Sequence, residues 1–218
     1  MFRGEAGGLT HRYTLLEKSS DPDHARGFDG SDAIYLITPD RFVNGDPAND
    51  SVEGMPDKLD RAFKGGRHGG DIQGIVDALP YIRDMGFTAI WLNPVLENNV
   101  AEYSYHGYGA TDFYRVDARY GSNEQYRDLV QTAKAMGIGT IMDMIVNHSG
   151  EMHWWMDDLP AGDWLNFQDQ PVQTSHRRTT NMDPYASEYD RKRHSDGWML
   201  ESMPDLNQRN ALLGQRLM

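Results

Sequence analysis

The chain has 218 residues, of which 39% are hydrophobic, and its formal net charge is −12. A surface of that sign repels phosphate backbones, and no run of Lys or Arg favours an anionic membrane. The apolar runs are too short for a membrane-spanning helix. We therefore expect neither nucleic acid nor a membrane as a partner. Cysteine is absent, which excludes disulfides and zinc–thiolate sites but leaves the compartment, periplasm or cytoplasm, undecided.

The first 30 residues differ in pattern from those that follow. Residues 11–18, HRYTLLEK, alternate weakly between polar and apolar positions, as an edge strand does. Residues 21–30 are polar and contain Gly and Pro, which is typical of a linker. We interpret residues 1–30 as the remnant of an N-terminal β domain with its linker.

From residue 31 the chain alternates between short apolar runs and amphipathic segments. Residues 33–38, 87–92 and 138–146 predict strands that are buried on both faces. Residues 72–85 and 123–136 predict helices. Asp71 and Gly86 occupy the cap positions of the first helix, and Pro80 is expected to kink or break it. This alternation is typical of parallel strands in βαβ units, and thus of an α/β fold.

Three such strands predict an incomplete (β/α)8 barrel, because a complete one has eight strands in about 250 residues. We expect residues 31–148 to form the first part of this barrel and residues 149–207 to be a loop-rich insertion. Residues 208–218 would begin a truncated third barrel helix. Trp154 and Trp155 in the insertion could line a cleft or fill a core. The chain looks incomplete at its C-terminal end, and at its N-terminal end as well.

Polar residues follow the predicted strands, where parallel α/β folds collect functional groups. Asp143 and Asn147 would share one face of the third strand, and His148 begins the next turn. His148 could donate to a sugar hydroxyl. Alternatively, it satisfies a backbone carbonyl while Asp143 holds a neighbouring arginine.

The loop after the second predicted strand contains the sequence Tyr105-His106-Gly107-Tyr108. An aromatic ring can stack on the apolar C–H face of a sugar while polar groups bind its hydroxyls. An ordinary packed loop tyrosine is the alternative for this loop.

The loop after the first predicted strand is rich in oxygen-bearing side chains. Two further residues that could supply oxygen ligands, Gly69 and Asp71, lie at the start of the next helix. Calcium takes about six to eight oxygen ligands, so a calcium site is one interpretation and a solvated turn is the other. The spacing differs from that of an EF-hand. The four side chains of the loop are Asn44, Asp46, Asn49 and Asp50.

In their order along the chain, these elements resemble the alpha-amylase family of glycoside hydrolases (glycoside hydrolase family 13). The resemblance covers about residues 30–210. It is strongest to the cyclomaltodextrinase and neopullulanase branch. The segments that carry it are the strand ending in Asp40-Arg41-Phe42, the turn Tyr105-His106-Gly107-Tyr108, the stretch Asp143-Met144-Ile145-Val146-Asn147-His148, and Met203-Pro204-Asp205-Leu206-Asn207.

The resemblance implies roles for several of these residues. Tyr108 would stack on the sugar before the scissile bond, and His106 and His148 would hydrogen-bond to that sugar. Asp143 would orient an arginine beside the nucleophile, and Asn147 would support the loop into the inserted domain B. A structural calcium ion would be held by Asn44, Asp46, Asn49, Asp50, Gly69 and Asp71.

The resemblance also implies retaining hydrolysis of α-1,4-glucosidic bonds in cyclodextrins, pullulan or maltooligosaccharides by two carboxylates about 5 Å apart. In the family these carboxylates follow the fourth and fifth barrel strands. The catalytic residues are therefore expected beyond Met218, and the chain alone is expected to be inactive. Two alternatives stay open: a non-catalytic carbohydrate- or partner-binding barrel, and a glucan transferase or isomerase. This branch often dimerises through an N-terminal domain, so a homodimer is one expectation for the parent protein.

Overall fold

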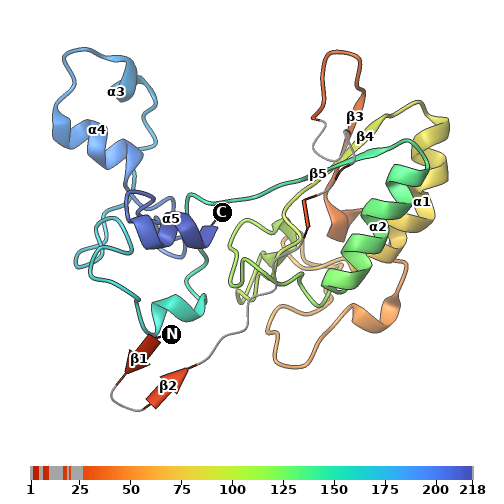
Figure 1. Cartoon of the computed structure of the whole chain (residues 1–218), viewed down its shortest axis with the longest axis horizontal. Helices are drawn as coiled ribbons and strands as arrows, with labels where there is room; N and C mark the ends of the chain where they lie inside the picture. The colour runs from red at the N-terminus through yellow and green to blue at the C-terminus, as the bar shows by residue number, and fades with distance from the viewer. Residues whose placement is uncertain (1, 5–6, 10–16, 19, 21–26, 218) are drawn as a thin grey trace. The chain divides into compact units, whose positions relative to one another are not determined.

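The computed structural model of the chain describes residues 2–4, 7–9, 17–18, 20 and 27–217, in two units, Met1–Ser31 and Asp32–Met218 (Figure 1). In the first unit, strands β1 (Phe2–Gly4) and β2 (Gly7–Leu9) pair antiparallel. The edge strand predicted at residues 11–18 lies mostly outside the described residues.

Three parallel strands form the sheet of the second unit in the order β3–β4–β5. They are β3 (Ile34–Ile37), β4 (Ala89–Leu92) and β5 (Gly139–Met142). The three predicted strands are therefore present, but the third ends at Met142 and not at residue 146. Its pairing stops opposite Leu92, and Pro94 soon afterwards has no N–H to extend the ladder. The expectation that Asp143 and Asn147 share a strand face is therefore wrong.

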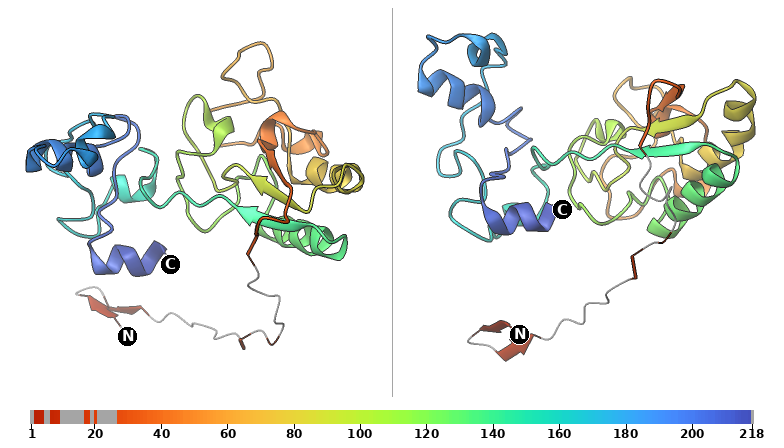
Figure 2. Two further views of the ribbon diagram at one scale, coloured as in Figure 1. Left: turned by 90° about the horizontal axis from the view of Figure 1, so that it is seen from above. Right: turned by 45° about the horizontal axis from the view of Figure 1, so that its top comes forward.

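Helices α1 (Ile72–Asp84) and α2 (Asn123–Ala135) lie side by side on one face of this sheet (Figures 1 and 2). The Asp71 side chain caps α1, as predicted, and accepts a hydrogen bond from the Gly74 N–H at 2.7 Å. Pro80 does not break α1. It lies on the exposed face, while Leu79 and Ile82 are fully buried and hold the helix to the sheet.

A second core lies mainly in the loop-rich region after β5. Trp155 belongs to this core and is 2% exposed, whereas Trp154 is 54% exposed. The final helix begins at Ala211 and not near residue 207, because the Asn210 side chain caps it by accepting from the N–H groups of Leu212 and Leu213 at 3.0 Å. The buried members of the core are Leu96, Ala110, Phe113, Trp155, Trp164, Leu165, Leu206 and Leu213.

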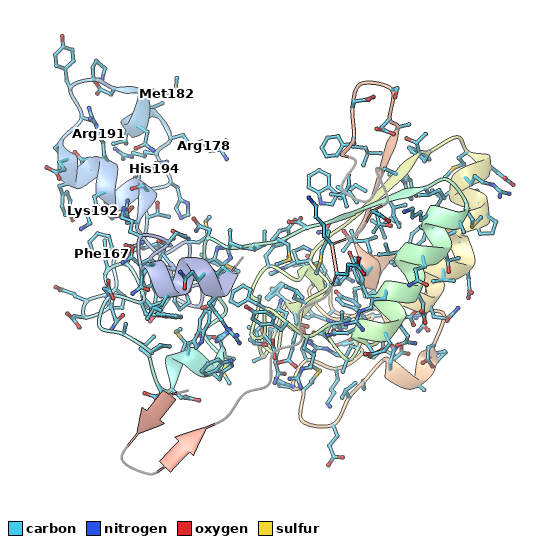
Figure 3. The ribbon with its side chains drawn as sticks, viewed as in Figure 1. Phe167, Arg178, Met182, Arg191, Lys192 and His194 are labelled. Atoms are coloured by element: carbon cyan, nitrogen blue, oxygen red, sulfur yellow. The ribbon has the colours of Figure 1, made fainter. Side chains whose placement is uncertain are left out.

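The loop-rich region contains four short helices among the described residues: η4 (Trp154–Met156), α3 (Thr179–Met182), α4 (Glu188–Ser195) and α5 (Ala211–Leu217). On α4, the Lys192 ammonium lies 5.5 Å from the ring centroid of Phe167, and Arg191 donates to the carbonyls of Asp183 and Pro184 (Figure 3). Within the described residues, no helix is long and apolar enough to cross a membrane.

His153 packs against the second core beside Phe113 and Trp155. Its Nδ1 atom accepts a hydrogen bond from the Trp155 N–H at 3.1 Å, and its ring centroid lies 4.1 Å from that of Trp155. Burial lowers the pKa of His153 to about 4. The neutral imidazole is therefore the form that the folded chain favours.

The lowered pKa of His153 should make the stability of the folded chain depend on pH. The unfolded chain binds a proton at His153 near pH 6.5, whereas the folded chain resists it until about pH 4, so stability should fall as pH decreases across that window. His153→Asn keeps a capping side chain but cannot titrate, and should flatten this part of the curve. Urea unfolding at intervals from pH 7 to pH 4 would measure it. An unchanged slope in the variant would contradict this assignment.

Candidate functional site

A tight turn after β4 positions the predicted sugar-contacting residues. Helix η3 (Ser104–His106) ends at Gly107, whose φ is +80°. A Cβ atom at Gly107 would lie 2.0 Å from the Pro94 carbonyl oxygen, so both the backbone angle and the close approach require glycine. The turn thereby presents Tyr108 directly after the helix.

The structure brings the four predicted sugar-contacting residues together around Tyr108. The Tyr108 hydroxyl donates to Asp143 Oδ2 at 3.3 Å, and the Tyr108 N–H donates to His106 Nδ1 at 2.9 Å. His148 Nε2 lies 2.8 Å from the Tyr108 carbonyl oxygen. One tyrosine is thus held at its backbone and at its hydroxyl by three polar side chains from different parts of the sequence.

Both histidines favour the neutral form. Burial lowers the pKa of His106 and of His148, and the neighbouring His148 lowers that of His106 further. Since His148 Nε2 faces a carbonyl, it donates there, so His148 satisfies a backbone carbonyl, the alternative left open by the sequence. His106 accepts at Nδ1, which leaves its Nε2–H to donate to a ligand hydroxyl.

Asp143 accepts hydrogen bonds from two aromatic side chains and holds no arginine among the described contacts. Besides the Tyr108 hydroxyl, Trp91 Nε1 donates to Asp143 Oδ2 at 3.3 Å. The pKa of the Tyr108 hydroxyl is raised, first by burial and then by the Asp143 charge. Sequence reasoning missed Trp91, which is 41% exposed although its strand reads as apolar throughout. The signal that could have identified Trp91 is its indole N–H, which needs a hydrogen-bond partner even in an apolar strand.

The segment around Asp205 packs beside His148. The backbones of His148 and Asp205 form an antiparallel bridge, and Asn147 Nδ2 donates to Asp205 Oδ1 at 2.9 Å. Asn166 Nδ2 donates to the other carboxylate oxygen at 2.8 Å. Burial raises the pKa of Asp205 to about 6. Asn147 therefore ties the end of the β5 region to the loop-rich region.

A buried polar network fixes the turn from inside the molecule. The Ser104 N–H donates to Asp57 Oδ2 at 2.9 Å, and Arg67 Nη1 donates to the Ser104 hydroxyl at 3.1 Å. Arg119 Nη1 donates to the Asp57 carbonyl at 2.8 Å and pairs with Asp117 at 2.7 Å. Burial alone would raise the pKa of Asp117, but the hydrogen bond and charge of Arg119 lower it.

Four of the six predicted calcium residues lie in the loop around helix η2 (Pro47–Asn49), and Asp71 binds that loop from the start of α1. Asp71 Oδ1 accepts from the Gly45 N–H at 3.2 Å, and Oδ2 accepts from the Asp46 N–H at 2.8 Å. Asn44 Nδ2 donates to Asp50 Oδ1 at 2.6 Å. Asp71 thus anchors the loop to the start of α1.

Two buried amide oxygens in this loop, Asn44 Oδ1 and Asn49 Oδ1, have no hydrogen-bond partner. Gly69 has φ of +85°, and a Cβ atom there would lie 2.3 Å from Asp50 Oδ1. Buried acceptors without donors are costly, and a cation would satisfy them. Among the described residues, no three or more His, Cys, Asp or Glu side chains are grouped to hold a metal. The three carboxylates of the predicted set, Asp46, Asp50 and Asp71, are therefore not gathered around one point, and the observation in favour of a cation is the pair of unpartnered amide oxygens.

Comparison with known proteins decides the family. Residues 36–215 match the family model for the alpha-amylase catalytic domain. The chain belongs to the alpha-amylase family. Neopullulanase 2 from Thermoactinomyces vulgaris is 34% identical over 198 residues, covering 84% of this chain and 31% of that protein. A beta/alpha-amylase from Paenibacillus polymyxa is 45% identical over 119 residues, covering 55% of this chain and 10% of that protein.

Solved structures agree with this family assignment. An Anoxybacillus alpha-amylase matches with a TM-score of 0.69 and 36% identity, over 85% of this chain and 36% of that one. The acarbose complex of a Geobacillus thermoleovorans alpha-amylase matches with a TM-score of 0.63 and 33% identity, over 85% and 35%. The chain thus spans about a third or less of the length of these relatives. Its three parallel strands correspond to part of an alpha-amylase catalytic domain.

Two glycines provide a matched test of the turn. Gly107 and Gly86 both have positive φ, but nothing lies within 4 Å of a Cβ atom at Gly86. Gly86→Ala should cost about 1 kcal/mol through backbone strain alone. Gly107→Ala adds the clash with Pro94 and should cost about 2 kcal/mol or more. Urea unfolding of both variants would measure this difference, and equal losses would show that the close approach does not matter.

Proposed function

We propose that this chain is the sugar-binding front part of a retaining glycoside hydrolase acting on α-1,4-glucosidic bonds of cyclodextrins, pullulan or maltooligosaccharides. The observation that carries the proposal is the placement of Tyr108, whose backbone is held by His106 and His148 and whose hydroxyl is held by Asp143. A rigid aromatic face with neighbouring polar tips is suited to one glucosyl ring. The family membership of the chain supports the same substrate class.

Each residue then has a role set by its contacts. Tyr108 stacks on the sugar, and His106 donates to a hydroxyl through Nε2–H. His148 and Asp143 position Tyr108 through its carbonyl and its hydroxyl. In this proposal the β3–β4–β5 sheet is the first part of a (β/α)8 barrel, residues 149–207 are its domain B insertion, and the nucleophile and general acid belong to later strands.

The 218-residue chain should therefore bind maltohexaose without cleaving it. Tyr108→Ala removes the stacking face and should weaken binding by about tenfold or more, whereas Tyr81→Ala, on the exposed face of α1, should leave it unchanged. Isothermal titration calorimetry would measure affinity, and chromatography would detect products. Turnover by the purified chain would contradict the proposal that the nucleophile and general acid belong to later strands. Absence of binding would contradict the proposed sugar site.

A glucan transferase is the second candidate, because a cyclomaltodextrin glucanotransferase also matches with a TM-score of 0.62 and 29% identity. The same site would bind the same glucans in either enzyme. Incubating the parent protein with maltohexaose separates the two: products longer than the substrate indicate transfer, and shorter products alone indicate hydrolysis. A parent protein that binds but does neither would be a non-catalytic barrel.

We further propose that the loop at residues 44–50, with Gly69 and Asp71, binds a structural calcium ion. Its support is the pair of buried, unpartnered oxygens of Asn44 and Asn49 beside the Asp50 carboxylate. Bound calcium would join the loop after β3 to the start of α1 and stabilise both.

Calcium should raise the melting temperature of the chain. At a concentration about 100 times the dissociation constant, binding adds about 2.7 kcal/mol, or several degrees for a chain of this size. Calorimetry in calcium, in magnesium and in EDTA would measure the shift. Asp50→Ala should abolish it, while Asp158→Ala, in an exposed turn, should keep it. An equal shift in both variants would show that calcium binds elsewhere.

A further inference from the structure

Tyr103, just before the sugar-binding turn, has an unusual backbone conformation. Its φ of 60° and ψ of 19° place it in the left-handed region, which bulky residues rarely adopt. Its side chain is nevertheless 43% exposed. Such conformations persist where the surroundings over-determine them, and they concentrate at functional sites. The structure therefore holds an exposed aromatic ring in place at an energetic cost.

The peptide after Tyr103 is fixed by buried groups. Ser104 is fully buried, its N–H donates to Asp57 Oδ2 at 2.9 Å, and its carbonyl accepts from Asn98 Nδ2 at 3.1 Å. Arg67 donates to its hydroxyl. The N–H, the carbonyl and the hydroxyl of Ser104 are thus all hydrogen-bonded, and these bonds hold the Tyr103 backbone in its left-handed conformation.

The Tyr103 ring is held from the side by the neighbouring loop. It meets Phe63 edge-on, with ring centroids 5.5 Å apart and planes at 67°. A Cβ atom at Gly65 would lie 2.2 Å from Tyr103 Cε1, so the ring packs directly on that backbone. Phe63 is itself 38% exposed. Two rings from two loops thus form one rigid, partly exposed aromatic surface.

This aromatic pair is linked to the Tyr108 site through Arg41 and Tyr105. Arg41 Nη2 donates to the carbonyl of Lys64, which lies between Phe63 and Gly65. The Arg41 guanidinium also lies 3.9 Å from the ring centroid of Tyr105, and that ring lies 5.6 Å from the His106 ring. A chain of direct contacts therefore leads from the aromatic pair to the residues around Tyr108.

We propose that Phe63 and Tyr103 form an additional glucosyl-binding subsite, separate from the one at Tyr108 and engaged only by longer glucans. The proposal rests on the proposed function, because it takes the ligand to be an α-glucan. An exposed aromatic ring suits the apolar face of one sugar, whereas a stable protein interface needs about 1,000 Å² or more. Lys64 and Glu102, which are exposed and next in sequence to Phe63 and Tyr103, carry polar groups suited to sugar hydroxyls.

The test compares a long and a short ligand on the 218-residue chain. Tyr103→Asn removes the ring with a residue that tolerates the left-handed region. It should weaken maltohexaose binding about tenfold and change maltose binding by less than about twofold. Phe63→Ala, in an exposed loop, should act in the same direction. Tyr103→Phe keeps the ring and should keep wild-type affinity. Tyr81→Asn, at an exposed tyrosine of α1, is the matched control.

The outcomes separate this inference from the proposed function. If Tyr103→Asn and Phe63→Ala bind maltohexaose like the wild type while Tyr108→Ala loses both sugars, the subsite is wrong and the proposed function stands. Equal weakening of maltose and maltohexaose would also overturn the subsite, because the ring would then act through the Tyr108 site. A wild-type chain that binds neither sugar would overturn both.

Discussion

The buried ion pair between Arg119 and Asp117 is the contact on which the geometry of the candidate site depends. Both side chains are fully buried and joined by two hydrogen bonds, of 2.9 and 2.7 Å. Arg119 also donates to the carbonyls of Asp57 and Asn98 at 2.8 Å. Removing one partner of such a pair typically costs about 3–5 kcal/mol, because the other charge stays buried without compensation. Since Asp57 and Asn98 both bind Ser104, this one pair fixes the turn that presents Tyr103 and Tyr108.

Arg67 makes a second buried link, and its hydrogen bonding is less complete. Its Nε atom lies 3.6 Å from Asp40 Oδ1, and its guanidinium lies 4.6 Å from the ring centroid of Tyr120. Two of its nitrogens have no hydrogen-bond partner. Tyr120 in turn donates its hydroxyl to the Tyr105 carbonyl at 2.8 Å. Arg67 therefore joins the end of β3 to the sugar turn through charge and an aromatic face, in addition to one hydrogen bond to Ser104.

Local patterns in the sequence predicted the three parallel strands and helices α1 and α2, while the grouping of residues around Tyr108 was implied by the family resemblance. Apolar runs located all three parallel strands, and the Asp71 cap was evident from its position before an amphipathic segment. The partners of Asp143 and Ser104 could not be predicted. Trp91 reaches Asp143 across 52 positions of sequence, and Arg119 reaches Asp57 across 62. Such contacts depend on how loops fold back, and they leave no periodic signature. Helix α1 continues through Pro80 for a related reason, because tertiary packing overrides the tendency of proline to end a helix.

The two candidate sites share one short segment, residues 67–71. Arg67 binds Ser104 in the sugar turn, Gly69 lies against Asp50 in the candidate calcium loop, and Asp71 caps α1. The buried Asp40 carboxylate holds this segment by accepting from the N–H groups of His68 and Gly69. The backbone that lies against Asp50 at Gly69 is thus two residues from the arginine that binds Ser104. The candidate calcium loop and the turn that carries Tyr108 therefore both depend on residues 67–71, which Asp40 holds at the end of β3.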